Sequence, residues 1–389
     1  MTTEAFINPA VLRWARQREH LTRVNAARSV GFNEERLEAW EAGTDRPTLR
    51  QAQTLAQKLG IPFGYLYLPS PPVEELPLPD LRTVADAATL APSPELSAVL
   101  ADVLAMQEWY REYLEEAGAE RITFVGKFTL AANPEPRIVA DEIRERFGIN
   151  GDVRQRVHSW EEFLRYFIQT SEAQGVMVLR SGVVGNNAHR KLEVAEFRGF
   201  AISDDLAPLV FINGQDAKAA QIFTLAHEIA HLWFGVSGIS NPNYRALSSE
   251  QGNPVERLCN RTAAELLVPS TDFSEQWQDA DAIEENLQRL AARYRVSAFV
   301  VLRQAYDLKR IDGETYWTNY DALLGKTTKP HGGGGNFYAT LFARNSKTMT
   351  TAIVRALAEG KILHRDAARL LNVKVSTLAG ISRHVFEGA

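Results

Sequence analysis

Residues 227–231 read His-Glu-Ile-Ala-His, a set of residue types and spacings that can build a hydrolytic zinc site. His227 and His231 are four positions apart, about one helical turn, so both side chains project from the same face of a helix. Two neutral imidazoles in this arrangement can bind one Zn²⁺, and Glu228 beside them can act as the base for a water molecule. The alternative is a helix in which the two histidines only form hydrogen bonds. The flanking residues are largely apolar, which favours a buried active-site helix: Phe223, Leu225, Ile229, Leu232, Trp233 and Phe234.

A catalytic zinc ion needs a third protein ligand and keeps one coordination position open. The next predicted helix opens on an Asn-Pro pair, which is typical of a helix start, and ends before Pro269. On this helix Glu256 and Asn260 are four residues apart, so Glu256 could bind zinc while Asn260 orients a ligand. Glu265 competes as third ligand, and Glu256 could instead form an ion pair in solvent with a neighbouring arginine. Glu256 is favoured because the Glu-x-x-x-Asn pair supplies both a ligand and its orienting neighbour.

The two helices together carry a family resemblance. HEIAHLWF followed by ERLCNRTAAELLVP resembles the ImmA/IrrE family of zinc metallopeptidases over about residues 160–300. The resemblance implies zinc ligands at His227, His231 and Glu256, a catalytic glutamate at Glu228, and a gluzincin-like arrangement. Thr262 stands where the family usually has an aromatic residue, a departure that concerns packing. Several members of this family cleave repressors or other DNA-binding regulators.

Residues 9–68 show short helical patterns separated by tight turns, which predicts an all-α helix-turn-helix domain. The stretch from Ala26 to Thr48, with its W-E-x-G-x-x-x-P-T signature, resembles the Cro-repressor-like (XRE) family. This resemblance covers about 60 residues.

DNA binding by this domain is one of two interpretations. Asn33 and Arg36 open the presumed recognition helix and could read base edges, and Arg23 or Arg46 could contact phosphates. The same helix carries three glutamates that repel phosphates, and residues 1–70 hold nine Lys/Arg against seven Asp/Glu. The alternative is a protein-recognition or dimerisation module that keeps the fold, so a homodimer is among the expected partners.

The region between the two motifs predicts a small sheet in front of the zinc helix. Helical patterns cover residues 95–120, about 136–147 and 160–174, and strand patterns cover 175–179, 197–202 and 208–213. We expect an edge strand to pair with an extended peptide and place its scissile bond over the metal. Residues 200–203 are the candidate for that edge, although an ordinary core strand fits them equally well.

The chain as a whole predicts a multi-domain, mainly α protein with a small β-sheet. Five segments follow one another along the chain: an XRE-type domain (1–70), a Pro-rich linker (71–94), an α+β gluzincin-like metallopeptidase domain with leading helices (95–325), a Gly-rich linker (326–336) and a basic helical region (337–389). The last region has eight Lys/Arg against three Asp/Glu, and residues 366–381 have the spacing of a second helix-turn-helix. That element is either a nucleic-acid or partner-binding site or a small bundle with a solvated basic face.

Composition predicts a cytoplasmic enzyme. The 389 residues are 45% hydrophobic and 23% charged with a net charge of −5, so attraction to nucleic acid must come from local patches. The single Cys259 excludes an internal disulfide and is expected to be a small buried side chain. Neither a signal peptide nor a membrane span is predicted, so no membrane partner is expected.

These patterns predict a zinc-dependent endopeptidase in which Glu228 moves the proton and a further group donates to the oxyanion. His189, Tyr244 and Arg261 are candidates for that donor. The expected substrate is a protein: a transcriptional repressor, an antitoxin or a similar DNA-associated regulator. The alternative is a non-catalytic helix-turn-helix regulator or antitoxin whose zinc domain senses a ligand or partner.

Overall fold

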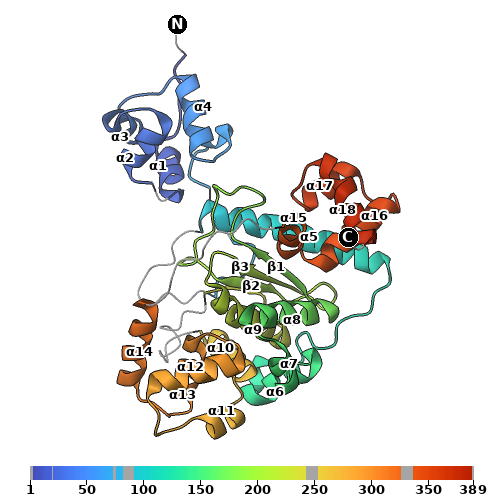
Figure 1. Cartoon of the computed structure of the whole chain (residues 1–389). Coiled ribbons are helices and arrows are strands. Elements are labelled where there is room, and N and C mark those ends of the chain that lie inside the picture. Colours follow the sequence, from blue (N-terminus) through green and yellow to red (C-terminus); the bar gives the residue numbers. More distant parts are fainter. Residues whose placement is uncertain are drawn as a thin grey trace. The chain divides into compact units, whose positions relative to one another are not determined.

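The computed structural model describes residues 3–19, 21–72, 76–81, 92–241, 253–325 and 336–387. These fall into two compact units, one formed by residues 1–77 and 87–101 and the other by residues 78–86 and 102–389 (Figure 1). No helix among the described residues is long and apolar enough to cross a membrane. The predicted fold class, a multi-domain and mainly α protein with a small β-sheet, is confirmed, and the sheet has four strands.

The first unit contains a helix-turn-helix domain whose helices begin at polar caps. The side chains of Asn8, Thr22, Asn33 and Thr48 each accept a hydrogen bond from the first turn of the following helix. Its elements are α1 (Pro9–Arg18), α2 (Arg23–Val30), α3 (Glu34–Ala42), α4 (Leu49–Lys58) and the 3₁₀ helix η1 (Phe63–Tyr67). Their apolar faces share one core that includes Leu12, Ala27, Leu37, Trp40, Leu55 and Leu66.

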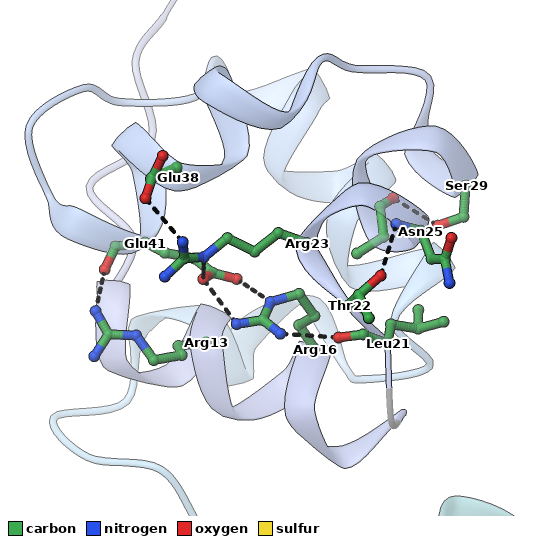
Figure 2. Close-up of polar contacts among 10 residues, drawn as sticks. Arg13, Arg16, Leu21, Thr22, Arg23, Asn25, Ser29, Glu38 and Glu41 are labelled. Atoms are coloured by element: carbon green, nitrogen blue, oxygen red, sulfur yellow. Dashed lines mark hydrogen bonds and ion pairs between the residues drawn. The ribbon is translucent and has the colours of Figure 1, made fainter.

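A buried ion-pair cluster joins three of these helices (Figure 2). The Glu41 carboxylate of α3 accepts two hydrogen bonds from Arg16 of α1, at 2.6 and 3.0 Å, and a longer one of 3.4 Å from Arg23 of α2. Arg23 also donates to the exposed Glu38 at 2.8 Å, and Arg13 donates to the Glu41 carbonyl at 2.8 Å. Since Arg16 and Glu41 are both withdrawn from water, each stabilises the charge of the other.

Replacing Glu41 by glutamine should therefore destabilise this domain strongly. The substitution leaves the buried Arg16 guanidinium without its counter-charge, which typically costs about 3–5 kcal/mol. Hydrogen exchange of the α1–α3 amides in the whole chain would report the loss. Glu38→Gln is the matched control, because Glu38 lies on the same helix as Glu41 but is exposed and pairs with the exposed Arg23, and it should cost less than about 1 kcal/mol. Equal losses in the two variants would contradict the structural role of the buried pair.

The second unit is built around a sheet with strand order β1-β3-β2-β4. The strands are β1 (Met177–Ser181), β2 (Gly199–Ile202), β3 (Leu209–Asn213) and β4 (Gly238–Ser240). β1 is parallel to β3, while β2 is antiparallel to both β3 and β4. Helices α8 (Trp160–Ala173) and α9 (Lys218–Phe234) pack against the sheet, α9 against β2 and β3 (Figure 1).

The peptide-binding edge predicted at residues 200–203 is wrong. β2 lies between β3 and β4, so its backbone groups are already used on both sides. β4, which the sequence did not predict, takes the outer position. It has only three residues, Gly-Ile-Ser, too short for an alternating pattern to be visible.

Further helices surround the sheet and α9. They are α5 (Pro94–Glu116), of which residues 102–116 belong to this unit, η2 (Leu130–Ala132), α6 (Pro136–Phe147), α7 (Gly151–Arg156), α10 (Pro254–Leu267), α11 (Ser270–Gln276), α12 (Ile283–Tyr294), α13 (Ala298–Asp307) and α14 (Gly313–Gly325). α10 packs against both α6 and α9, and one apolar core extends from α6 through α9 and α10 to α14. This packing fixes α9 and α10 relative to each other.

The C-terminal helices α15 (Phe337–Asn345), α16 (Lys347–Ala358), α17 (His364–Leu370) and α18 (Val375–Glu387) belong to the same unit. α15 packs along β1. The Glu172 carboxylate of α8 accepts a hydrogen bond from the Lys347 backbone at 3.0 Å and another from the Ser346 hydroxyl. α17 and α18 are joined at the predicted turn, residues 372–374, where Asn372 has a φ of 52°. Most of the predicted Gly-rich linker, residues 326–335, lies outside the described residues.

Candidate metal centre

The predicted zinc-binding motif lies on a helix, α9, that is buried all round. Every residue of α9 from Gln221 to Phe234 is buried, and the helix ends at Gly235, whose φ of 69° suits glycine. His227 and His231 are fully buried one turn apart. Their Nε2 atoms lie 3.0 Å from each other, so both imidazoles point to one place.

Glu256 completes a three-ligand cluster. Its carboxylate oxygens lie 3.3 Å from the His227 Nε2 and 3.1 Å from the His231 Nε2. A tetrahedral zinc ion with ligand bonds of about 2.0–2.1 Å requires ligand atoms about 3.3–3.4 Å apart. The three side chains therefore have the chemistry and very nearly the spacing that a zinc ion needs. Among the described residues, they form the one group of His, Cys, Asp and Glu with this convergence.

The start of α10 places Glu256 in this cluster. The Asn253 side chain accepts a hydrogen bond from the Val255 backbone at 3.0 Å, and Pro254 occupies the first turn. Glu256 follows in that same turn, and the packing of α10 on α9 carries it to the histidines.

Ser240 of β4 is a site residue that sequence analysis missed. Its hydroxyl donates to the Glu256 carboxylate at 3.3 Å and lies 3.3 Å from the His231 Nε2. The chain carries no local signal for this contact, because it depends on how β4 pairs with β2. Ser240 brings the sheet into direct contact with the group formed by His227, His231 and Glu256, which is called the metal cluster below.

Glu228 is a buried carboxylate with no ordinary hydrogen-bond partner among the described residues. Burial raises its pKa well above the usual value, and the nearby charge of Glu256 raises it further, while the Ser240 hydroxyl opposes the shift. Gly199 of β2 makes room for it. A Cβ at that position would lie 2.8 Å from the Glu228 Oε1 and 2.9 Å from the Phe211 carbonyl oxygen, closer than real contacts allow. The sheet can therefore lie this close to Glu228, the predicted base, only because residue 199 has no side chain.

The cluster residues favour the protonation states of metal ligands. Burial raises the pKa of Glu256, but His227 and His231 outweigh this effect and lower it to about 2. Burial lowers the pKa of His231, which favours neutral imidazole. Burial raises the pKa of the neighbouring Cys259 thiol well above its usual value, so this side chain is a neutral thiol rather than a ligand.

The structure places the remaining predicted site residues elsewhere or leaves them without a tested role. Glu265 is bound away from the histidines, since it accepts hydrogen bonds from Ser270 and Gln304. The Asn260 side chain is buried, and its Oδ1 has no partner among the described residues, so its orienting role stays a prediction. His189 and Arg261 have exposed side chains, and Tyr244 lies outside the described residues.

The residues predicted to contact DNA are exposed, and each also has an intramolecular role. Asn33 caps α3 by accepting from the Arg36 backbone at 3.2 Å, and the Arg36 guanidinium lies over the Trp40 ring. Arg23 forms the ion pairs with Glu38 and Glu41 described above. Arg46 lies over the exposed Phe6 ring, 4.0 Å from its centre. Arg23 and Arg46, the predicted phosphate contacts, are thus both engaged within the domain while remaining exposed.

Two histidines and an adjacent glutamate on a buried helix, completed by a glutamate from the next helix, define a site of the H-E-x-x-H peptidase class. Family models agree with this assignment. Residues 172–306 match the IrrE N-terminal-like domain of the peptidase M78 family, residues 12–66 match a helix-turn-helix model, and residues 345–384 match a domain family of unknown function. No curated protein sequence matches the chain. The chain joins an XRE-type helix-turn-helix domain to an IrrE-like peptidase domain, so the resemblance inferred from the sequence is confirmed.

Proposed function

We propose that the chain is a zinc-dependent endopeptidase with a regulatory helix-turn-helix domain. The observation that carries the proposal is the convergence of His227, His231 and Glu256 beside the buried Glu228, within a domain that matches a peptidase family. Histidine nitrogens and a carboxylate are ligands that a catalytic zinc ion uses, and three protein ligands leave a fourth position open.

Different residues of the chain would have different roles in hydrolysis. His227, His231 and Glu256 would hold the ion, and Ser240 would keep Glu256 oriented through its hydrogen bond. When bound, zinc lowers the pKa of a water molecule at its open position and polarises a carbonyl oxygen. A Glu228 carboxylate oxygen would take the proton from the attacking water and deliver it to the leaving amine nitrogen. Its burial supports this role, because a raised pKa brings a carboxylate closer to the proton affinity that such a base needs.

We propose a DNA-associated regulator, such as a repressor or antitoxin, as the substrate. The support is the helix-turn-helix domain in the same chain, which would bring the peptidase to DNA or to a protein bound there. Asn33 and Arg36 at the exposed start of α3 are the candidates for base contacts, while three exposed glutamates on the same helix oppose phosphate binding. Salt-dependent binding of a DNA duplex by the whole chain distinguishes DNA recognition from a protein-binding module.

Mapping of new protein N-termini in a cell extract tests the function. Zinc-loaded chain should generate a small number of new N-termini, concentrated in DNA-associated regulators, and removal of zinc by a chelator should abolish them. A chain that binds zinc yet creates no new N-terminus, while still changing gene expression, would favour the non-catalytic regulator instead.

A further inference from the structure

The segment Pro79–Leu81 pairs with the outer side of β4. The Ile239 backbone N–H donates to the Pro79 carbonyl at 2.9 Å, and the Leu81 N–H donates to the Ile239 carbonyl at 3.1 Å. The pairing is parallel, with Asp80 opposite Ile239. Because Ile239 directs both of its backbone groups to this segment, the segment uses the hydrogen-bonding positions that β4 would otherwise offer at the edge of the sheet.

The side chain of Leu81 lies on the face of the sheet that carries the metal cluster. Gly199 and Ser240 are paired across β2 and β4, and both face α9: Gly199 approaches Glu228, and Ser240 contacts Glu256. Gly238 is two residues before Ser240, so its side-chain position is on that same face. A Cβ at Gly238 would lie 2.3 Å from the Leu81 Cδ1, which places the Leu81 side chain there.

At the other end of the sheet, β1 has α15 packed against it. β4 is also the strand that contacts the metal cluster, through Ser240. An extended peptide that adds to a sheet gains affinity from main-chain hydrogen bonds and specificity from side-chain pockets. β4 is therefore the position at which a peptide substrate could pair with the sheet beside the metal.

We infer that Pro79–Leu81 is an autoinhibitory segment that occupies the substrate-binding edge of the peptidase. This inference rests on the proposed function, because it takes the cluster to be a peptidase site. The segment supplies two main-chain hydrogen bonds and one apolar side chain, which are the contacts that an extended peptide would make. A substrate must displace it before it can bind.

Two substitutions in the whole chain displace the segment by different means. Leu81→Pro removes the N–H that donates to Ile239, and Gly238→Ala places a methyl group where the Leu81 side chain now lies. Leu81→Ala keeps the N–H and removes only the side chain, which separates the two contributions. Gly151→Ala is the matched control for the glycine substitution, because a Cβ there meets no atom within 4 Å.

Two measurements on each zinc-loaded variant test whether the segment covers β4 and whether it blocks peptide binding. Hydrogen exchange of the Ile239 amide reports whether Pro79–Leu81 covers the edge. Binding of a tripeptide hydroxamate reports access to the edge and the metal together, whereas binding of acetohydroxamate, which has no peptide portion, reports the metal alone.

We expect Leu81→Pro to speed exchange at Ile239 and to tighten tripeptide hydroxamate binding about tenfold, the effect of freeing one or two backbone hydrogen-bonding groups. Gly238→Ala should act in the same direction, Leu81→Ala more weakly, and Gly151→Ala should match the wild type. Acetohydroxamate affinity should be the same in all variants. Faster exchange without tighter tripeptide hydroxamate binding would overturn the autoinhibitory role and leave an ordinary structural strand. Failure of the wild type to bind acetohydroxamate would instead overturn the proposed metal-dependent function, and the autoinhibitory role with it.

Discussion

Substitution of Glu228 by glutamine should abolish cleavage and leave zinc binding intact. Glutamine keeps nearly the shape of the side chain and fits beside Gly199, but it cannot accept the proton of the attacking water. Loss of a positioned general base typically costs about 10²–10⁴-fold in rate. The rate of appearance of new N-termini in extract treated with zinc-loaded chain measures the loss, and elemental analysis of the same preparation measures the metal.

The pairing of the two measurements makes this prediction specific. Glu228 makes no hydrogen bond of good geometry among the described residues, and glutamine keeps an oxygen that can face the Ser240 hydroxyl, so the variant should fold. Cleavage at the wild-type rate by the Glu228→Gln chain would exclude the proposed mechanism. Loss of zinc together with activity would mean that Glu228 is a ligand or a structural support, which is a different role from the one proposed.

The metal cluster could be largely predicted from sequence because its parts are local. His227 and His231 need only one turn of helix to converge, and the apolar residues around them indicate burial. Glu256 needed one further step, the packing of two consecutive helices, and the helix-start signal at Asn253 and Pro254 fixed its place in the first turn.

The parts that sequence did not predict depend on pairing between distant residues. Ser240 reaches the cluster because β4 pairs with β2, and Asp80 pairs with Ile239 across 159 positions of the chain. A strand of three residues and a Pro-rich segment carry no periodic pattern. Prediction of the edge at residues 200–203 was wrong for the same reason: a strand's neighbours in a sheet cannot be read from its own residues.

The domain boundaries predicted at residues 70, 94, 325 and 336 stay predictions. Two of them, 325 and 336, flank residues 326–335, which lie outside the described part of the chain. Local sequence signals predicted the helix bounds more accurately in the helices that precede the sheet. The pattern at 136–147 coincides with α6, because Pro136 at its start and Gly148 just beyond its end are strong local signals.

Substitution of Glu256 by glutamine should lower zinc affinity by at least about a hundredfold. Removal of an outer-shell partner already costs about 10–100-fold in metal affinity, and Glu256 is placed as a direct ligand. The amide also removes the negative charge that lies 3.1–3.3 Å from the two Nε2 atoms. Competition with a chelator of known affinity measures the change. The thermal stabilisation that zinc gives the wild type should also disappear in the variant at the same zinc concentration.

Glu265→Gln is the matched control, because both glutamates are buried on α10 and both were candidates for the third ligand. The Glu265 carboxylate accepts hydrogen bonds from the Ser270 backbone and hydroxyl, both at 3.1 Å, and from Gln304 at 3.2 Å. Its substitution should lower the stability of the chain without changing zinc affinity. If instead Glu265→Gln loses zinc and Glu256→Gln retains it, the third ligand is Glu265 and α10 must shift on α9 when the metal binds. The two variants thus decide whether the described packing of these helices is already that of the metal-bound site.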